Sequence, residues 1–329
     1  MSLPRSRQPA REAWTRDRLL HERAIALGHA IDRSTAQTYN SHLQSYLTFC
    51  KIHHFEIEPT ADTLSFYVVF MCHHIDPRSV SAYLSGICNT LEPHFPTVRA
   101  TRNGTLVTKT LTGMKKLRAS HSPTRKRPLN HADLISLFDR YDSGSYDDNL
   151  FLALVTTGFS SLMRVGEFTQ PDSISRRSPT KLTLRHTCRL TPSNYSFTLP
   201  YHKGDRFFDG NTILVERQPS TRTCPHTAFT KYIFARDTHF PLHPELWLTA
   251  AGNVPTYSWV VSRLKTSLGS DVGGHSIRSG GATALAVAGV PDHIIQLIGR
   301  WSSDTFHIYI RLHPVLLQAL LHGRSPHTT

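Results

Sequence analysis

Cysteine is sparse in this chain and follows no ligand or disulfide pattern. The 329 residues contain five cysteines, with no Cys-x-x-Cys pair. An odd, scattered set argues against a disulfide framework and against a zinc finger. The clusters His53-His54 and Cys72-His73-His74 lack a second ligand pair at zinc spacing. We therefore predict free thiols in a reducing compartment, no metal site and no cofactor. The cysteines are Cys50, Cys72, Cys88, Cys188 and Cys224.

Long apolar runs are also missing. No stretch approaches the roughly 20 apolar residues that a membrane-spanning helix needs, so we expect no membrane association. The segment from Met1 to Arg18 mixes arginine, proline and acidic residues without an apolar core, unlike a secretory signal. The hydrophobic fraction of 39% is ordinary for a soluble protein and is enough to form buried cores.

Acidic residues are too few to balance the basic ones. Lysine and arginine number 37 against 24 aspartates and glutamates, which gives a formal net charge of +13 with histidine neutral. A protein with this balance attracts polyanions, with nucleic acid as the first candidate and an anionic membrane surface as the second. A generic basic protein is the plain alternative.

The length favours two domains, because one hydrophobic core rarely serves so long a chain. Residues 1–13 are polar and contain arginine and proline, which predicts disorder. Residues 14–118 carry helical patterns. Residues 119–129 are basic, contain proline and serine and lack apolar periodicity, which is typical of an exposed linker. Residues 130–329 then form the second domain. A basic loop within a single domain is the alternative interpretation of 119–129.

The first domain is predicted to be a small helical bundle. Apolar residues recur there at three- and four-residue spacing in four stretches. Ser34 or Thr35 could cap the first helix, Thr60 starts the second, and Pro77 lies near the start of the third. The stripes run through 39–50, 64–71, 80–87 and 108–117.

The second domain is predicted to combine helices with a small sheet. Asn130 can cap a helix, and the apolar stretch from Asp147 to Glu167 predicts a long buried helix interrupted near Gly158. From 180 to 217 the pattern alternates, which predicts a small antiparallel sheet. Further helices are expected at 224–236, 258–268, 277–288, 291–298 and 313–321. The expected fold class is mainly α with a small antiparallel β-sheet.

Four segments of the second domain share a distinctive order. They are 158–167, 199–205, 275–278, and 299–301 followed by 309–311. Together they resemble the tyrosine recombinases, or phage-type integrases, and are most similar to those of fungal Crypton-like mobile elements. The runs His-Ser-Ile-Arg-Ser-Gly-Gly-Ala-Thr and Gly-Arg-Trp-Ser-Ser-Asp-Thr-Phe are the most specific. The resemblance implies an N-terminal helical, SAM-like core-binding domain and an α+β catalytic domain.

The chemistry of strand cleavage fits these residues. Cleavage of a phosphodiester needs a nucleophile, stabilisation of a charged pentacoordinate transition state, and a proton for the leaving oxygen. Arg164 and Arg278 match the family's two phosphate-binding arginines, whose guanidinium groups can bind the non-bridging oxygens. Such fixed charges lower the barrier without a metal ion. Glu167, one helical turn after Arg164, is expected to orient that arginine, and a plain surface ion pair is the alternative.

The resemblance assigns proton transfer to Lys203 and His275. The family places a mobile lysine on a hairpin tip, where it protonates the leaving 5′ oxygen, and Lys203 follows a β-like run. A solvated hairpin lysine is the alternative. His275 and Arg278 are three residues apart, so both are predicted on the first turn of one helix, facing one anion. A histidine there can exchange protons near neutral pH and assist Tyr309.

Tyr309 is the predicted nucleophile. It lies eight residues after Trp301, which stands where relatives carry histidine or tryptophan. The indole N–H of Trp301 can donate to a phosphate oxygen but cannot act as acid or base, and a plain core tryptophan is the alternative. Attack by the Tyr309 phenolate on phosphorus gives a 3′-phosphotyrosyl bond and a free 5′ hydroxyl. Because the bond energy is kept, rejoining needs no ATP.

The resemblance also implies how the protein works on DNA. The two domains are expected to clamp double-stranded DNA through phosphate contacts, so affinity should depend on salt. The reaction is expected in a homo-oligomeric synapse, tetrameric by analogy. The apolar tail helix at 313–321 could dock on a neighbouring protomer or on its own domain. A nuclear location is expected for a eukaryotic source, and otherwise an intracellular location with DNA.

Three other functions compete with this one. A catalytically silent, recombinase-derived DNA-binding protein would have no chemical reason to keep the whole set of catalytic residues. A type IB topoisomerase uses similar chemistry as a monomer, but the separate helical domain and the tail helix favour a recombinase. A basic helical scaffold with chance motifs is the third alternative.

Overall fold

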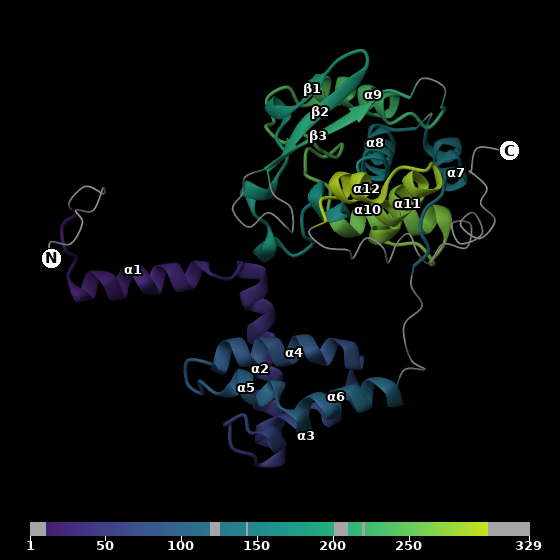
Figure 1. Ribbon diagram of the computed structural model, residues 1–329. Coiled ribbons are helices and arrows are strands. Elements are labelled where there is room, and N and C mark those ends of the chain that lie inside the picture. Colours follow the sequence, from purple (N-terminus) through teal and green to yellow (C-terminus); the bar gives the residue numbers. More distant parts are fainter. Residues whose placement is uncertain (1–10, 119–125, 143, 201–209, 219–220, 302–329) are drawn as a thin grey trace, which may run out of the picture. The chain divides into compact units, whose positions relative to one another are not determined.

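The computed structural model describes residues 11–118, 126–142, 144–200, 210–218 and 221–301. The chain divides into two compact units, Met1–Pro123 and Thr124–Thr329. The described residues are mainly helical, with one three-stranded antiparallel sheet in the second unit (Figure 1), so the predicted fold class is confirmed. None of the helices in these ranges is long and apolar enough to cross a lipid bilayer.

The first unit is a helical bundle. Its core comes from α2, α3, α4 and α6, where Tyr46, Tyr67, Leu84 and Val107 are buried, whereas α1 buries none of its residues. The helices are α1 (Arg16–His29), α2 (Arg33–His53), α3 (Ala61–His74), α4 (Pro77–Leu91), α5 (Val98–Asn103) and α6 (Thr105–Leu117).

Helix caps explain where these elements begin. The hydroxyl of Thr60 accepts a hydrogen bond from the backbone N–H of Thr63, so α3 starts where predicted. Pro77 occupies the first turn of α4, also as predicted. The cap of α2 is Asp32, whose Oδ1 accepts from Ser34 N at 2.9 Å, so the expected cap at Ser34 or Thr35 was wrong. The Asp32 carboxylate lies two residues before Ser34 and binds a free backbone N–H of the first turn, so the helix begins earlier than predicted.

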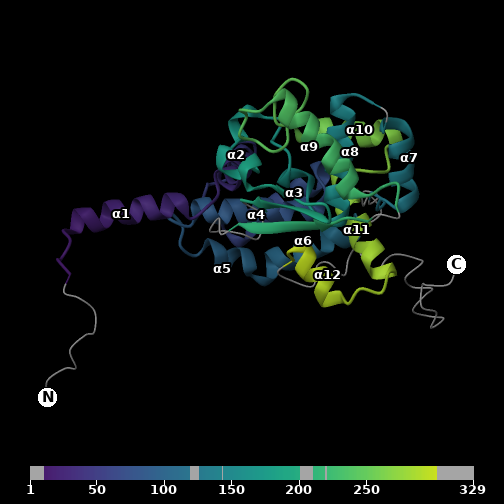
Figure 2. The same cartoon turned by 90° about the horizontal axis from the view of Figure 1, so that it is seen from above.

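The second unit packs a small sheet against helices. The sheet has the order β1-β2-β3, all antiparallel, and Tyr195 pairs with Val215 and Phe197 with Ile213. These four side chains are buried in one core with α8 and α9, and Figure 2 shows the unit from above. The strands are β1 (Arg189–Leu190), β2 (Asn194–Leu199) and β3 (Asn211–Glu216). The helices are α7 (His131–Tyr141), α8 (Tyr146–Ser160), α9 (Pro225–His239), α10 (Tyr257–Leu268), α11 (Gly274–Val287) and α12 (Asp292–Gly299).

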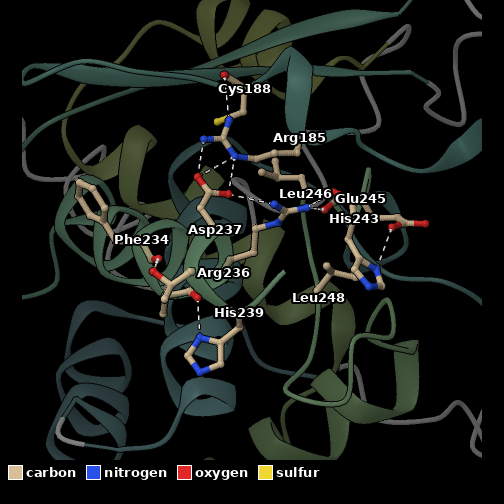
Figure 3. A network of polar contacts seen from close by, with 12 residues as sticks. Arg185, Cys188, Phe234, Arg236, Asp237, His239, His243, Glu245, Leu246 and Leu248 are labelled. Atoms are coloured by element: carbon tan, nitrogen blue, oxygen red, sulfur yellow. Dashed lines mark hydrogen bonds and ion pairs between the residues drawn. The ribbon is translucent and has the colours of Figure 1, made fainter. Parts of the chain in front are cut away.

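A partly buried ionic network joins the end of α9 to the segment that leads into the sheet (Figure 3). Arg185 Nη2 lies 2.6 Å from Asp237 Oδ2, and Arg236 Nη1 lies 2.9 Å from the other oxygen of that carboxylate. Arg236 also donates to the carbonyl oxygens of His243 and Glu245. Burial alone would raise the pKa of Asp237, but the hydrogen bonds from the two arginines outweigh it and lower the pKa. The network thus ties α9 and residues 243–245 to the base of the sheet.

The end of the predicted linker belongs to the second unit. Lys126 Nζ donates to Ser270 O at 2.8 Å, and Arg127 forms an ion pair with Asp133 at 2.6 Å. Leu129 is buried in the core of that unit. An exposed linker over the whole of 119–129 is therefore wrong at its C-terminal end, because the leucine at 129 needs burial and draws its neighbours with it.

Two glycines allow α11 to approach its neighbours closely. A Cβ on Gly281 would lie 2.0 Å from the carbonyl oxygen of Phe159, at the end of α8. A Cβ on Gly280 would lie 2.3 Å from the carbonyl oxygen of Leu129. Real side chains do not come so near to backbone oxygens, so the contact between α11 and α8 requires glycine here.

Gly281→Ala should destabilise the second unit by about 2 kcal/mol or more, since the methyl group would overlap backbone that cannot move without shifting a helix. Urea unfolding followed by tryptophan fluorescence would measure it, because Trp247 is buried in this core. Gly166→Ala is the matched control, since nothing lies within 4 Å of the position that its methyl group would take. Equal midpoints for the two variants would contradict the close approach.

Candidate active site

The segment carrying Arg164 begins at a sharp turn after α8. The helix ends at Ser160, and Leu162 adopts a left-handed backbone with φ 51°. The predicted helix from Asp147 to Glu167 is therefore too long. Leu162 is buried against Ala282 and Ile295, and this burial offsets a backbone strain of about 1–3 kcal/mol. The turn sends the following residues away from the helix axis.

Arg164 and Glu167 meet, but not across a turn of α-helix. Arg164 has an extended backbone and precedes a 3-10 turn, η2 (Val165–Glu167). Arg164 Nη1 donates to Glu167 Oε1 at 2.9 Å, and the backbone N–H of Arg164 donates to Oε2 at 3.0 Å. The Glu167 side chain is 5% exposed and that of Arg164 is 26% exposed. The contact is thus a nearly buried ion pair and not the plain surface pair.

Arg300 is a second cation on the same carboxylate, and the order of motifs predicts no role for it. Its Nη2 donates to Glu167 Oε2 at 2.9 Å, and its Nη1 donates to the carbonyl oxygens of Ile298 and Ser161. Burial lowers the pKa of Arg300, partly offset by Glu167, but an arginine stays charged in proteins. The sequence feature that could have pointed to Arg300 is its position between Gly299 and Trp301, within the quoted motif.

Arg278 lies where α8, α11 and α12 come together. It is on the first turns of α11 with His275, as predicted. His275 is exposed, whereas Arg278 is 1% exposed. The Arg278 guanidinium donates to the carbonyl oxygens of Leu162 and Gly299. Arg278 therefore links the turn before Arg164 to the end of α12. It is the second buried guanidinium of this region, after that of Arg300.

Trp301 covers the guanidinium of Arg278. The Arg278 Cζ atom lies 4.1 Å from the centroid of the indole ring, within cation–π range. The ring also lies against Gly299, where any side chain would overlap it. Trp301 is partly exposed and packs at the edge of a small cluster with Leu162 and Ile295. The Trp301 ring therefore covers one face of the Arg278 guanidinium.

Two predicted site residues lie outside the described residues. They are Lys203 and Tyr309, together with the tail helix expected at 313–321. Of the remaining five, the structure gathers Arg164, Glu167, Arg278 and Trp301 around the end of α8, and places His275 on the exposed side of α11. Among the described residues, no three side chains of His, Cys, Asp and Glu are placed to hold a metal together.

The charges of this cluster suit an anion. Three guanidinium groups (Arg164, Arg278 and Arg300) lie here, and the Glu167 carboxylate binds two of them, Arg164 and Arg300. The excess positive charge is held on short turns and helix ends by backbone carbonyls, so it needs little reorganisation when an anion arrives. Arg164 is the most exposed of the three and is thus the most accessible to a ligand. The arrangement can stabilise a negatively charged transition state.

Solved structures show where this fold has been seen before. The chain resembles the XerH site-specific recombinase bound to palindromic difH substrate in a post-cleavage complex, with a TM-score of 0.60, 15% identity, and coverage of 87% of this chain and 78% of that chain. The Tn1549 transposon integrase in complex with circular intermediate DNA gives a TM-score of 0.58 at 14% identity, covering 93% and 98%. A lambda integrase dimer bound to a COC′ core site gives 0.52 at 14% identity, covering 90% and 94%. At these identities the likeness establishes the fold, which is that of the tyrosine recombinases.

Comparison by sequence finds no matching family model and no match among curated proteins.

Glu167→Gln should lower the free energy of unfolding of the second unit by about 3 kcal/mol, because it leaves two partly or fully buried guanidinium groups without a counter-charge. Urea unfolding monitored by tryptophan fluorescence would measure the change. Glu92→Gln is the control, since Glu92 pairs with Arg99 at 2.7 Å on an exposed surface. That variant should unfold like the wild type, because exposed pairs contribute little. An unchanged midpoint for Glu167→Gln would refute the proposed ion-pair arrangement.

Proposed function

We propose that this protein is a tyrosine recombinase that performs site-specific recombination or integration on double-stranded DNA. The observation that carries the proposal is the Glu167-bound Arg164 beside the buried Arg278, on the fold of recombinases that were solved with DNA. We propose that it is most similar to the enzymes of fungal Crypton-like elements, and this proposal is supported by the residues of the two motifs around Arg278 and Trp301.

The proposed reaction is a transesterification at phosphorus. The phenol oxygen of Tyr309 attacks, a P–O bond to Tyr309 forms, and the bond between phosphorus and the 5′ oxygen breaks. His275 helps to remove the phenolic proton, and Lys203 supplies a proton to the leaving 5′ oxygen. Arg164 and Arg278 bind the non-bridging oxygens as negative charge grows on them, and Trp301 donates its indole N–H. Rejoining is the reverse attack by a 5′ hydroxyl.

The partners follow from charge and from the related complexes. A net charge of +13 favours contact with DNA phosphates. We propose that the first unit is a core-binding domain that grips the duplex beside the catalytic unit. The lambda integrase has been solved as a tetramer bound to a Holliday junction, and we propose the same assembly for this chain. A nuclear location is proposed if the protein comes from a eukaryote.

A covalent adduct with DNA is the decisive outcome. The full chain would be incubated with nicked suicide duplexes carrying a randomised core, and adducts would be trapped with detergent and sequenced. The wild type should form an adduct whose nuclease-trimmed peptide contains phosphotyrosine at Tyr309. Tyr309→Phe should reduce adducts to background, because phenylalanine has no nucleophilic oxygen. Tyr141→Phe, whose hydroxyl contacts Ser267 away from the site, should react like the wild type.

The same reaction separates the competing functions. DNA binding without an adduct on any duplex would favour the silent DNA-binding protein. Relaxation of supercoiled plasmid by monomers would favour a type IB topoisomerase. An adduct that survives Tyr309→Phe would overturn the assignment of the nucleophile.

Adduct formation should also be unchanged by an excess of EDTA, because arginine side chains are proposed to supply the charge that a metal ion supplies elsewhere. The measurement is the adduct yield over time in matched reactions with and without the chelator. Loss of the adduct with EDTA, restored by added Mg²⁺, would contradict the proposed metal-independent mechanism.

A further inference from the structure

Arg300 is a buried charge with an unusual set of contacts. Its side chain is 9% exposed, and its backbone has φ 55° at the C-terminal end of α12. One side of its guanidinium binds Glu167, and the other reaches the carbonyl oxygens of Ser161 and Ile298. Burying a guanidinium is costly unless it is paired. The contacts to α8, η2 and α12 show that this arginine connects three elements that meet at the site.

The Glu167 carboxylate is shared between its two cations. Oε1 accepts from Arg164 Nη1, whereas Oε2 accepts from both Arg164 N and Arg300 Nη2. Contacts on both oxygens fix the rotation of the carboxylate plane, and this plane sets where Arg164 Nη1 lies. Without Arg300, Oε2 would keep only the backbone N–H of Arg164. Both remaining contacts of the carboxylate would then come from Arg164 itself. With no anchor on α12, the carboxylate and the Arg164 guanidinium would be able to turn together.

We propose that Arg300 is a positioning residue that acts through Glu167 to hold Arg164 in its phosphate-binding orientation. The inference rests on the proposed function. Arg300 is also the C-cap residue of α12, the helix that precedes the Trp301–Tyr309 segment. Its hydrogen bond to Glu167 therefore makes the orientation of Arg164 depend on how α12 packs. The carbonyl of Gly299, bound by Arg278, reinforces the same dependence.

The test is a double-variant cycle on the rate of adduct formation. Single-turnover rates would be measured for wild type, Arg300→Gln, Glu167→Gln and the double variant, with DNA affinity measured separately by filter binding. Arg300→Gln should slow adduct formation by about 10–100-fold, the usual effect of losing a partner that orients a site residue. DNA affinity should change by less than about threefold, because affinity for DNA is expected to come from many phosphate contacts together. In the Glu167→Gln background the same substitution should add little further loss.

Two further variants separate positioning from a general loss of structure. Arg300→Lys keeps the charge and should recover part of the rate, since an ammonium can still reach a carboxylate. Arg263→Gln removes a partly buried arginine that pairs with Asp148 at 2.7 Å, away from the site, and should leave the rate unchanged. Thermal unfolding of each variant would show that the folded protein is being compared.

The outcomes are distinct. Wild-type adducts with an unimpaired Arg300→Gln variant would overturn this inference and leave the proposed function standing. An equal loss in both backgrounds would also overturn it, because Arg300 would then act independently of Glu167, for instance directly on the phosphate. A fall in DNA affinity that matches the fall in rate would mean that Arg300 serves binding alone. No adduct with the wild type would overturn the proposed function and this inference together.

Discussion

The buried carboxylate of Glu167 is the contact on which the geometry of the site depends. It lies between two guanidinium groups, Arg164 and Arg300, which would otherwise repel each other at the meeting point of α8, η2 and α12. A single negative charge therefore holds together two positive ones and still leaves the cluster cationic. A third guanidinium, that of Arg278, donates to the backbone carbonyls of Leu162 and Gly299 and adds its positive charge to the cluster.

Helix packing places these charges within reach of one another. Gly280 and Gly281 let α11 lie directly on the backbone of residues 129 and 159, which brings Arg278 to the carbonyl oxygen of Leu162. A side chain at either glycine would push α11 away and break that contact. The glycines that follow Arg278 in the motif are therefore as important to the arginine cluster as the arginine itself, since they set the distance at which the helices pack.

Local rules predicted much of this fold. Thr60, Pro77 and Asn130 stand at the starts of α3, α4 and α7, because capping depends on a few neighbouring atoms. Apolar and polar residues alternate in 194–199 and 211–216, and this local pattern correctly predicted two paired strands. The prediction failed at the end of α8, where an apolar run continued past Ser160. The left-handed turn at Leu162 depends on the pocket offered by Ala282 and Ile295, more than a hundred residues away.

The sequence by itself determined most of the helices, the sheet and the order of Arg164, His275, Arg278 and Trp301, because caps, periodicity and motif spacing are properties of neighbouring residues. The helices α1 and α5 were not among the predicted stretches. It also placed Glu167 close to Arg164. Only the tertiary structure decided that Arg300 shares Glu167, that Arg278 is buried beneath Trp301 while His275 is exposed, and that the chain turns at Leu162. Those outcomes come from contacts between segments far apart in the chain, where burial and pairing of charge outweigh local preference.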